Sequence, residues 1–344
     1  MVINMKVSIR DVAREAGVSI TTVSHALNGY PDVAQSTCRK IKEVANRLDY
    51  QPNINGRNLA RKGGNSIALV ISDLLERDQR DITTFRMIQG VYAYCREYGL
   101  EVAVYAHDPE QLTYSQFCKS HAVEGAILSG IRGNDPCLED LMEMPIPFVA
   151  MDMECFLDTK KCITIDNVAA AAAITRLLLK KGHHRILVVA DKAHSVEQAD
   201  REIGVRTAME QEGVPLQEND ILHCEADDTY TEERCACKMM EQYLEKNGNT
   251  RHTAVLCLSD FLALGVRKAI KEAGYSIPGD FSITGFGGTI LSEYIEPSLT
   301  TVEWDAMDCG YAAAQILHAR KQGIESEKTI IPYHIAVRDS VKKI

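Results

Sequence analysis

Strand-like apolar runs alternate with helical patterns over most of the chain, and this alternation restricts the possible folds more than any other feature. The apolar runs fall at 67–71, 102–105, 125–129, 147–151, 163–166, 185–190, 220–224, 254–258 and 281–286. The helical patterns fall around 82–98, 110–121, 169–179, 200–212, 231–246 and 261–273. This order is typical of βαβ units, which build parallel sheets covered by helices. So many strands favour two open sheets, whose ligands bind beyond the carboxyl ends of the strands.

Polar side chains follow several of these runs, at the edge where such a sheet binds ligands. They are Ser72-Asp73, Asp152, Asp191 and Ser259-Asp260. Ser and Asp after a strand also commonly cap the next helix, so each has a structural alternative. Their recurrence at one kind of position is what favours a ligand site.

The charge of the chain is divided unevenly. The 344 residues carry a net charge of −10, which by itself argues against a nucleic-acid-binding protein. Residues 1–62 nevertheless hold ten Lys/Arg and five Asp/Glu, a net charge of +5, whereas the remaining residues carry −15. A basic segment on an acidic chain predicts a nucleic-acid or other anionic partner for that segment.

The basic segment contains the pattern of a helix-turn-helix. Apolar residues recur at helical spacing over 9–16, and Gly17 ends this helix. We expect Ser19 to cap a second helix over 20–27 and Ser36 to cap a third over 37–48. Two short helices joined through a Gly-containing turn place the second helix in the major groove of DNA.

Packing of the second helix decides which of its residues face outward. Val23, Ala26 and Leu27 are expected to pack inward, against Ile41, Val44, Ala45 and Leu48 of the third helix. The outward residues are then Ile20, Thr21, Thr22, Ser24 and His25. Hydroxyls and imidazole can bind phosphates or base edges, and isoleucine can contact a thymine methyl. The alternative is the bare surface of an ordinary helical subdomain.

Other classes of protein find little support. No run approaches 18 apolar residues and no secretory signal opens the chain, so we expect a cytoplasmic protein without a membrane span. The P-loop, G-x-S-x-G and a G-x-G-x-x-G after the first strand are all missing, so we expect neither an enzyme nor a cofactor.

The eleven cysteines are scattered through apolar runs, which favours reduced thiols used as small hydrophobic side chains. Cys235 and Cys237 are the only close pair, and no zinc-binding spacing surrounds them. We therefore expect no metal site.

The run D-V-A-R-E-A-G-V-S-I-T-T-V-S-H-A-L-N at 11–28 resembles the head of the lac repressor and purine repressor family of bacterial regulators, and L-D-Y-Q-P-N at 48–53 is also similar. Similar landmarks follow at 165–167, 182–186, 201–205, 259–265 and 297–302, so the resemblance covers nearly the whole chain. It implies a homodimeric transcriptional regulator, usually a repressor, that binds a pseudo-palindromic operator in double-stranded DNA.

The resemblance also implies a hinge. In the family the linker folds on the operator into a helix whose leucine wedges into the minor groove. Asn53 matches the hinge start, Arg57 the usual Arg or Gln, and Leu59 the wedge, with a packed linker residue as its alternative. Because Gly costs about 1 kcal/mol relative to Ala in a helix, Asn55-Gly56 predicts a hinge that is less helical without DNA. The expected DNA-binding residues are Ser19, Ile20, Thr21, Thr22, Ser24, His25, Asn28, Asn53, Arg57 and Leu59.

The resemblance implies three parts: a helix-turn-helix head at 1–50, a hinge or linker at 51–64, and an effector-binding and dimerisation body at 65–344. The fold class is therefore a small all-α head plus an α/β body, similar to periplasmic binding proteins, of two doubly wound parallel-sheet subdomains. Three crossovers would join the subdomains, placed at about 65–163 with 294–327 and at about 164–293 with 328–344.

A small sugar-like effector is expected between the subdomains. Arg201 matches an arginine that grips sugar hydroxyls, Ser259 an asparagine with a similar role, and Asp152 an acidic pocket residue. The alternative for Arg201 is a surface ion pair with Glu197 or Glu202.

Departures from the family refine the expected ligand. Gly287-Gly288 stands where the family usually has an aspartate, which makes room for a second sugar unit or exposes N–H groups to a phosphorylated one. D-I-T-T at 81–84 removes an aromatic wall, so purines are less expected. Trp304 matches a pocket-facing position and could stack on a sugar, with a core aromatic as its alternative. The expected effector residues are Ser72, Asp73, Asp152, Arg201, Ser259, Asp260, Gly287, Gly288 and Trp304.

Several alternatives remain open at this point. They are an α/β sugar-acting enzyme, a free-standing sugar-binding protein, and a regulator that answers to a corepressor, a phosphorylated sugar or a protein partner.

Overall fold

The computed structural model divides the chain into two compact units, Met1–Gly64 and Asn65–Ile344. It describes residues 7–28, 33–50, 66–72, 82–131, 135–151, 162–191, 196–224, 231–249, 251–325 and 329–344. The first unit is called the head and the second the body. Among the described helices, none combines the length and the apolar character needed to cross a membrane.

In its described residues the head contains three helices, α1 (Ile9–Ala16), α2 (Ile20–Asn28) and α3 (Gln35–Arg47). Gly17 ends α1 in the left-handed conformation, at a φ of 68°, as the sequence predicts. The Oγ atom of Ser19 accepts a hydrogen bond from the Thr22 amide at 3.0 Å, which confirms the predicted cap of α2. The predicted cap of α3 is wrong, because this helix begins at Gln35 and so includes Ser36.

The three helices bury one small apolar core. Val23 and Ala26 of α2 are at most 2% exposed and pack with Ile41, Val44 and Ala45 of α3. Leu27 and Leu48 pack against this core while remaining partly exposed. The predicted inward face of α2 is therefore confirmed, and its other face is left toward solvent.

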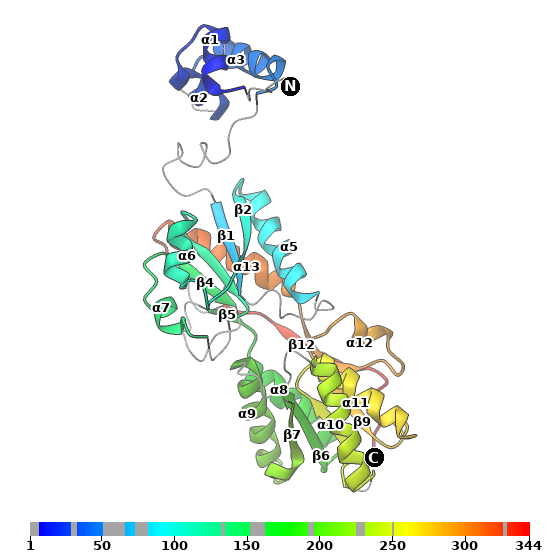
Figure 1. The fold of residues 1–344 in the computed structure, drawn as a ribbon. Helices are drawn as coiled ribbons and strands as arrows, with labels where there is room; N and C mark the ends of the chain where they lie inside the picture. Colours follow the sequence, from blue (N-terminus) through cyan, green and yellow to red (C-terminus); the bar gives the residue numbers. More distant parts are fainter. Residues whose placement is uncertain are drawn as a thin grey trace. The chain divides into compact units, whose positions relative to one another are not determined.

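The described part of the body forms two six-stranded sheets (Figure 1). The first sheet runs in the order β11-β5-β4-β3-β1-β2 and is parallel throughout. Its strands are β1 (Ser66–Ser72), β2 (Glu101–His107), β3 (Ala126–Ser129), β4 (Phe148–Met151), β5 (Cys162–Thr164) and β11 (Thr329–Ile330). An order in which the chain leaves the middle of the sheet in both directions is that of a doubly wound fold, with a ligand crevice at the point of reversal.

The second sheet runs in the order β12-β10-β9-β8-β6-β7. Its strands are β6 (Ile186–Asp191), β7 (Ile221–Cys224), β8 (Ala254–Cys257), β9 (Ser282–Phe286), β10 (Thr300–Trp304) and β12 (Tyr333–Ala336). All neighbours are parallel except β10 and β12, which pair in antiparallel fashion. The doubly wound class is confirmed, with this one antiparallel edge.

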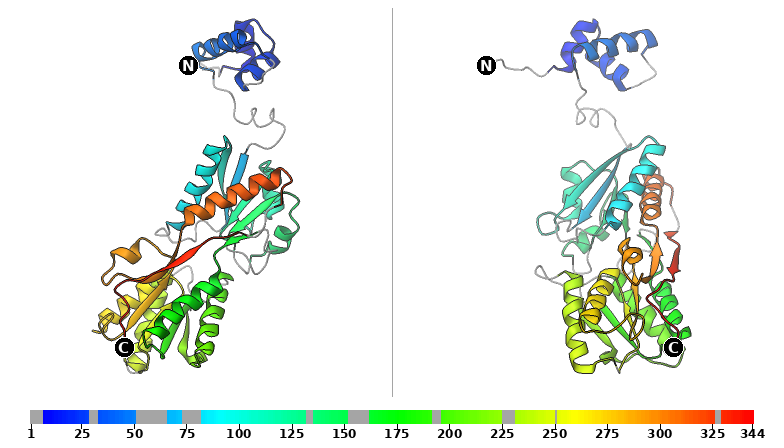
Figure 2. Two further views of the ribbon diagram at one scale, coloured as in Figure 1. Left: turned by 180° about the vertical axis from the view of Figure 1, so that it is seen from behind. Right: turned by 90° about the vertical axis from the view of Figure 1, so that its right-hand side faces the viewer.

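Helices cover both sheets. They are α5 (Thr83–Glu97), α6 (Tyr114–Ser120), α7 (Leu138–Met142), α8 (Asn167–Lys180), α9 (Val196–Gln211), the 3₁₀ turn η3 (Glu218–Asp220), α10 (Glu232–Asn247), α11 (Asp260–Glu272), α12 (Leu291–Tyr294) and α13 (Ala306–Lys321). Figure 2 shows α5 and α13 side by side, although more than 200 residues separate them in the sequence. A Cβ atom on Gly90 would lie 1.9 Å from the Met307 carbonyl oxygen, so the two helices touch backbone to backbone.

The chain passes between the two sheets three times, after β5, after β10 and after β11. This agrees with three crossovers but moves two boundaries of the sequence-based division. That division assigns residues 300–304 to the first subdomain, yet β10 pairs with β9 of the second sheet. It assigns residues 329–330 to the second, yet β11 pairs with β5 of the first. β10 thus lies between β9 and β12 in the second sheet, and β11 forms the edge of the first sheet beside β5.

One cysteine assignment is also wrong. Cys224, at the end of β7, is joined to Cys235 of α10 by a disulfide. The other described cysteines are free, and all of them except Cys38 are buried. The prediction of small buried thiols therefore applies to those seven cysteines, whereas Cys235 pairs with Cys224 and not with its near neighbour Cys237.

Candidate DNA-binding surface and effector pocket

The exposed face of α2 carries the residues that the sequence assigns to DNA. Ile20 is 45% exposed and Thr21 is also exposed, whereas Thr22, Ser24 and His25 are half-buried. The Ser19 hydroxyl lies 2.8 Å from that of Thr22, so these two residues share the first turn of the helix. Ile20 and Thr21 are thus the side chains of α2 most available to a partner.

The remaining predicted DNA-binding residues lie outside what the structure describes. Asn28 is the last residue of α2, but its side chain is outside the described set. The same holds for Asn53, Arg57 and Leu59, and for the Asn55-Gly56 departure. Their roles, and the expectation of a weakly helical hinge, stay predictions.

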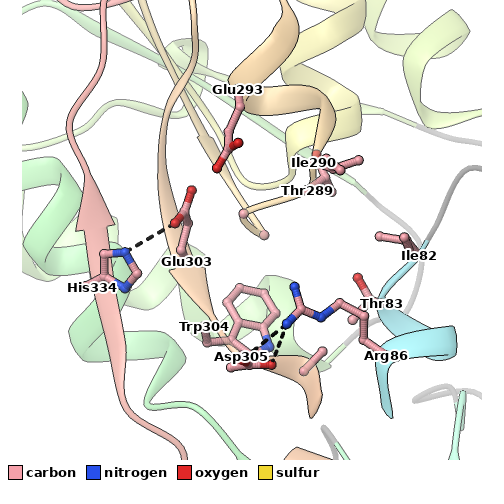
Figure 3. Close-up of a pocket in the computed structure, with 13 residues that line it drawn as sticks. Ile82, Thr83, Arg86, Thr289, Ile290, Glu293, Glu303, Trp304, Asp305 and His334 are labelled. Carbon is pink, nitrogen blue, oxygen red and sulfur yellow. Dashed lines mark hydrogen bonds and ion pairs between the residues drawn. The ribbon is translucent and has the colours of Figure 1, made fainter. Parts of the chain in front are cut away.

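A pocket of about 400 Å³ opens in the body beside Trp304 (Figure 3). We call it the Trp304 pocket. Its lining residues are Ile82, Thr83, Arg86, Gly287, Gly288, Thr289, Ile290, Glu293, Glu303, Trp304, Asp305, Ala306 and His334. The first three belong to the start of α5 on the first sheet, and Gly287 and Trp304 stand at the carboxyl ends of β9 and β10. The pocket therefore lies where an open parallel sheet binds its ligands.

Three of the nine predicted effector residues line this pocket, namely Gly287, Gly288 and Trp304. Trp304 is half-buried, and its ring centroid lies 5.8 Å from that of Phe286. It therefore packs against a core aromatic ring and also forms part of the pocket wall. Asp73 and Asp152 lie outside the described residues. Ser72, Arg201, Ser259 and Asp260 are described but do not line the Trp304 pocket.

Ser72, at the end of β1, is 1% exposed and hydrogen-bonds to Tyr114 at 2.9 Å. Ser259 caps α11 by accepting from the Leu262 amide at 3.1 Å, and its hydroxyl donates to Glu232 at 2.6 Å. The structural alternative, a helix cap after a strand, is thus realised at Ser259.

Asp260 is buried, at 1% exposure, between β9 and β10. Its carboxylate accepts hydrogen bonds from the Thr289 amide and hydroxyl and from the Thr301 hydroxyl, at 2.6–3.0 Å. Burial raises the pKa of Asp260 above its usual value, while these hydrogen bonds lower it. Asp260 thus links Thr289, which follows Gly287-Gly288, to Thr301 of β10.

The glycine pair does not present two free N–H groups to an anion. The Gly287 amide donates to the Val302 carbonyl at 2.9 Å, as part of the contact between β9 and β10. Gly288 has a φ of 61°, and a Cβ there would lie 2.5 Å from Cγ and 2.9 Å from Cβ of Glu303. The backbone at Gly288 therefore lies close to the Glu303 side chain. Beside Glu303, the pocket has less space for a second sugar unit than the sequence led us to expect.

The charged groups of the pocket neutralise one another. Arg86 donates to both carboxylate oxygens of Asp305, at 3.0 and 3.2 Å. His334 lies 3.2 Å from Glu303, whose carboxylate also binds Arg338. Arg338 in turn lies 3.3 Å from Glu293. A pocket lined by paired charges and an indole face suits a neutral polar ligand better than an anion.

Arg201 is 8% exposed, and its Cζ lies 6.0 Å from the Trp304 ring centroid. Its guanidinium donates to the Asn167 side chain and the Leu258 carbonyl, both at 2.9 Å, and its Cζ lies 4.1 Å from the Phe286 ring centroid. The surface ion pair with Glu202 is not formed, because Glu202 binds Arg206 and His223. A direct grip on a sugar stays a prediction.

Sequence reasoning missed five ionisable residues of the pocket lining, Arg86, Glu293, Glu303, Asp305 and His334. Two of them flank Trp304 at a strand end, so the rule applied to Ser259-Asp260 could have found them had β10 been recognised. His334 lies on β12, a short strand that follows no helix. Nothing in the sequence around Arg86 marks it as a pocket residue, because it reaches Asp305 only through the packing of α5 against α13.

Replacing Gly288 by alanine should destabilise the body by about 2 kcal/mol, because the side chain would occupy a left-handed position and collide with Glu303. Gly213 supplies the matched control, since its φ is 73° but nothing lies within 4 Å of the Cβ that alanine would add. Gly213→Ala should cost only about 1 kcal/mol. Urea unfolding measures both variants, and equal costs would show that contact with Glu303 is unimportant.

Comparison with known proteins agrees with both units. Residues 8–53 match the family of bacterial regulatory proteins of the lacI type, and residues 175–341 match the periplasmic binding protein-like domain. Catabolite control protein A of Priestia megaterium is 29% identical, over 98% of this chain and 100% of its own length.

Two solved structures share the fold. The lac repressor dimer bound to operator and the anti-inducer ONPF matches with a TM-score of 0.81 and 22% identity, covering 98% of this chain and 99% of that one. The transcriptional regulator CelR in complex with cellobiose matches with a TM-score of 0.71 and 23% identity, covering 97% and 100%. The chain therefore joins a head that matches the lacI family of bacterial regulatory proteins to a periplasmic binding protein-like body, and it is a DNA-binding transcriptional regulator.

Proposed function

We propose that this protein is a homodimeric, sugar-responsive regulator, acting as a repressor of genes for carbohydrate use. The observation that carries the DNA-binding part is the capped helix α2, which leaves Ile20 and Thr21 exposed above a buried core. A helix of this kind reads base edges in the major groove, while basic residues bind the phosphates. Because its target is chromosomal DNA, we expect it to act in the cytoplasm.

A second copy of the chain is the partner that the body favours. Phe85 and Tyr92 lie seven residues apart on α5 and are 57% and 56% exposed, with Ile82 nearby at 39%. Such a spacing places large apolar side chains on one face of the helix. The opposite side of α5 is occupied by α13 at Gly90. Covering this stripe in a dimer would present two heads to a pseudo-palindromic operator.

The proposed effector is a neutral sugar of one or two units, bound in the Trp304 pocket. The indole of Trp304 offers a flat apolar face, and Thr289 and the paired charges around it offer donors and acceptors for hydroxyls. Phosphorylated sugars are disfavoured because Arg86, the arginine of the lining, already binds the Asp305 carboxylate. The cellobiose bound by CelR is consistent with this class of ligand.

A thermal-shift screen of the full chain against mono-, di- and phosphorylated sugars tests the effector. We expect a neutral sugar to raise the Tm of the wild-type protein, and Trp304→Ala to abolish that rise. Trp304→Phe, which keeps an aromatic face, should retain part of it. A rise only with phosphorylated sugars, or one that Trp304→Ala leaves intact, would contradict the assignment. Neither result would bear on DNA binding by the head.

A further inference from the structure

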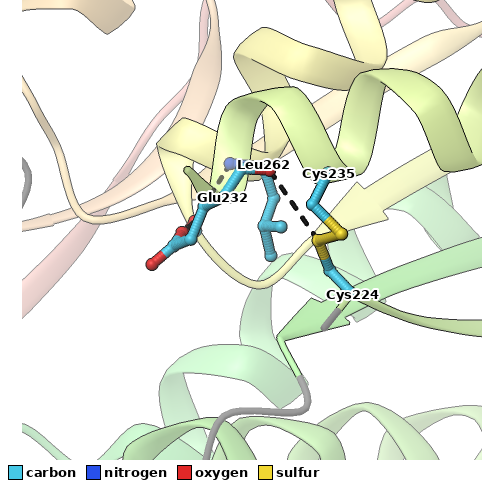
Figure 4. Close-up of a disulfide and its surroundings, with 5 residues drawn as sticks. Cys224, Glu232, Cys235 and Leu262 are labelled. Carbon is cyan, nitrogen blue, oxygen red and sulfur yellow. Dashed lines mark hydrogen bonds between the residues drawn. A yellow bond between two sulfur atoms is a disulfide. The ribbon is translucent and has the colours of Figure 1, made fainter. Parts of the chain in front are cut away.

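The disulfide between Cys224 and Cys235 lies at the carboxyl edge of the second sheet (Figure 4), and neither cysteine lines the Trp304 pocket. Cys224 ends β7 and is fully buried, whereas Cys235, in the first turns of α10, is half-buried. Their Cα atoms are 5.9 Å apart, within the range that a disulfide bridges without backbone movement. The two cysteines are therefore positioned to be joined or separated within the same fold.

We propose that Cys224 and Cys235 form a redox-responsive site, in which hydrogen peroxide converts two thiols into one disulfide. This step rests on the proposed function, because a DNA-binding regulator works in a compartment where thiols are kept reduced. A disulfide in such a compartment is more often a transient, redox-sensing bond than a permanent structural one. The site would therefore cycle between thiol and disulfide.

The chemistry balances with peroxide as the oxidant. The Cys235 thiolate attacks one peroxide oxygen, which breaks the O–O bond and leaves a sulfenic acid and hydroxide. The Cys224 thiol then attacks the Cys235 sulfur, forming the S–S bond and releasing water. Overall, two thiols and one peroxide give one disulfide and two waters. A thiol-disulfide exchange partner restores the thiols.

Position makes Cys235 the attacking thiol. It lies four residues into α10, a helix of 16 residues, where the N-terminal dipole stabilises a thiolate. It is half-buried, so peroxide can reach it, whereas Cys224 is enclosed. An accessible attacking thiol beside a buried resolving thiol is the arrangement that favours a disulfide over further oxidation.

Four other cysteines of the body are poor competitors. Cys95, Cys118 and Cys257 are buried, which raises the pKa of each thiol, to about 11 for the first two. Cys237, only two residues from Cys235, is 7% exposed, and burial together with Glu241 raises its pKa to about 11. Thiols of this kind stay protonated near neutral pH and react slowly.

The crosslink also reaches the neighbourhood of Ser259. Glu232 begins α10, its carboxylate accepts the Ser259 hydroxyl at 2.6 Å, and its backbone carbonyl faces the Cys224 sulfur. Oxidation therefore ties the end of β7 to the turn that binds the cap of α11. We expect the oxidised body to be more resistant to unfolding than the reduced one, because a crosslink limits the unfolded chain.

The test uses the full-length protein, reduced, freed of reductant and treated with hydrogen peroxide. We expect a mass loss of about 2 Da, the two thiol hydrogens, and a non-reduced tryptic map that links 207–234 to 235–238. The second peptide also holds Cys237, so Cys237→Ser is the matched control and should keep the crosslink. Cys235→Ser should lose it. The Tm should rise by at least about 3 °C on oxidation of the wild-type protein and of Cys237→Ser, and not at all in Cys235→Ser.

Three results would overturn the proposal. One is the absence of the mass loss at a tenfold excess of peroxide. The second is a crosslink that persists in Cys235→Ser or disappears in Cys237→Ser. The third is oxygen addition at Cys235 without a disulfide. If Cys235→Ser fails to fold, Cys235→Ala replaces it, and the wild-type peptide map still decides which cysteines join. Because the readouts are mass and Tm, failure here leaves DNA and sugar binding untouched.

Discussion

Replacing Thr21 by glutamate is expected to weaken binding of the full chain to its operator by at least about 100-fold. Thr21 is exposed in the first turn of α2, next to the capped end formed by Ser19. The substitution removes a hydroxyl that can donate to DNA and brings a carboxylate toward the phosphates. Because the side chain lies outside the head core, folding should be unchanged. Fluorescence anisotropy with labelled duplex measures the affinity, and circular dichroism the helix content.

Asn46→Asp is the matched control, since it adds the same negative charge at an exposed position near the end of α3. If contact by α2 matters, this variant should bind within a few-fold of the wild-type protein. Thr21→Ala, which removes only the hydroxyl, should fall between the two. Equal losses for Thr21→Glu and Asn46→Asp would mean that charge alone, and not the face of α2, explains the effect.

Replacing Arg201 by alanine is expected to destabilise the body by about 3 kcal/mol. The guanidinium is buried and supplies the hydrogen bonds to the Asn167 side chain and the Leu258 carbonyl. Removing it leaves these two acceptors without that donor and takes away the cation over the Phe286 ring. Urea unfolding followed by tryptophan fluorescence measures the change, since Trp304 is the chain's single tryptophan.

Arg201→Lys tests the geometry of the group. Lysine keeps the positive charge but lacks the planar fork, so it should recover only part of the lost stability. A cost of less than about 0.5 kcal/mol for Arg201→Ala would show that the contacts of Arg201 are unimportant to the fold. A sugar whose thermal shift survives Arg201→Ala would contradict a role for this residue in effector binding.

Much of the architecture follows from local patterns. All nine apolar runs form strands, and in the described residues eight of them are followed by a helix, as β8 is by α11. The helix-turn-helix was predictable because its signals are local: Gly17 ends α1, and Ser19 caps α2 by a hydrogen bond to a residue three positions later. Ser36 failed as a cap because α3 begins at Gln35, two residues before the predicted start at 37.

What could not be predicted depends on contacts between distant segments. Pairing with distant strands decides which sheet contains β10, β11 and β12. Their sheets could therefore not be assigned from the predicted subdomain boundaries. Arg86 meets Asp305 only because α5 and α13 pack together. Likewise, Cys224 meets Cys235 only through the return of α10 onto β7, whereas the sequence had favoured reduced thiols.

Selection of bound duplexes from a random DNA pool by the full-length protein tests the central claim most directly. Two heads in a dimer predict enrichment of one pseudo-palindrome, with half-sites about 10 base pairs apart or a multiple of that spacing. The same selection with Thr21→Glu should enrich nothing. Failure of the wild-type protein to enrich any sequence, or an identical pseudo-palindrome from Thr21→Glu, would contradict the account.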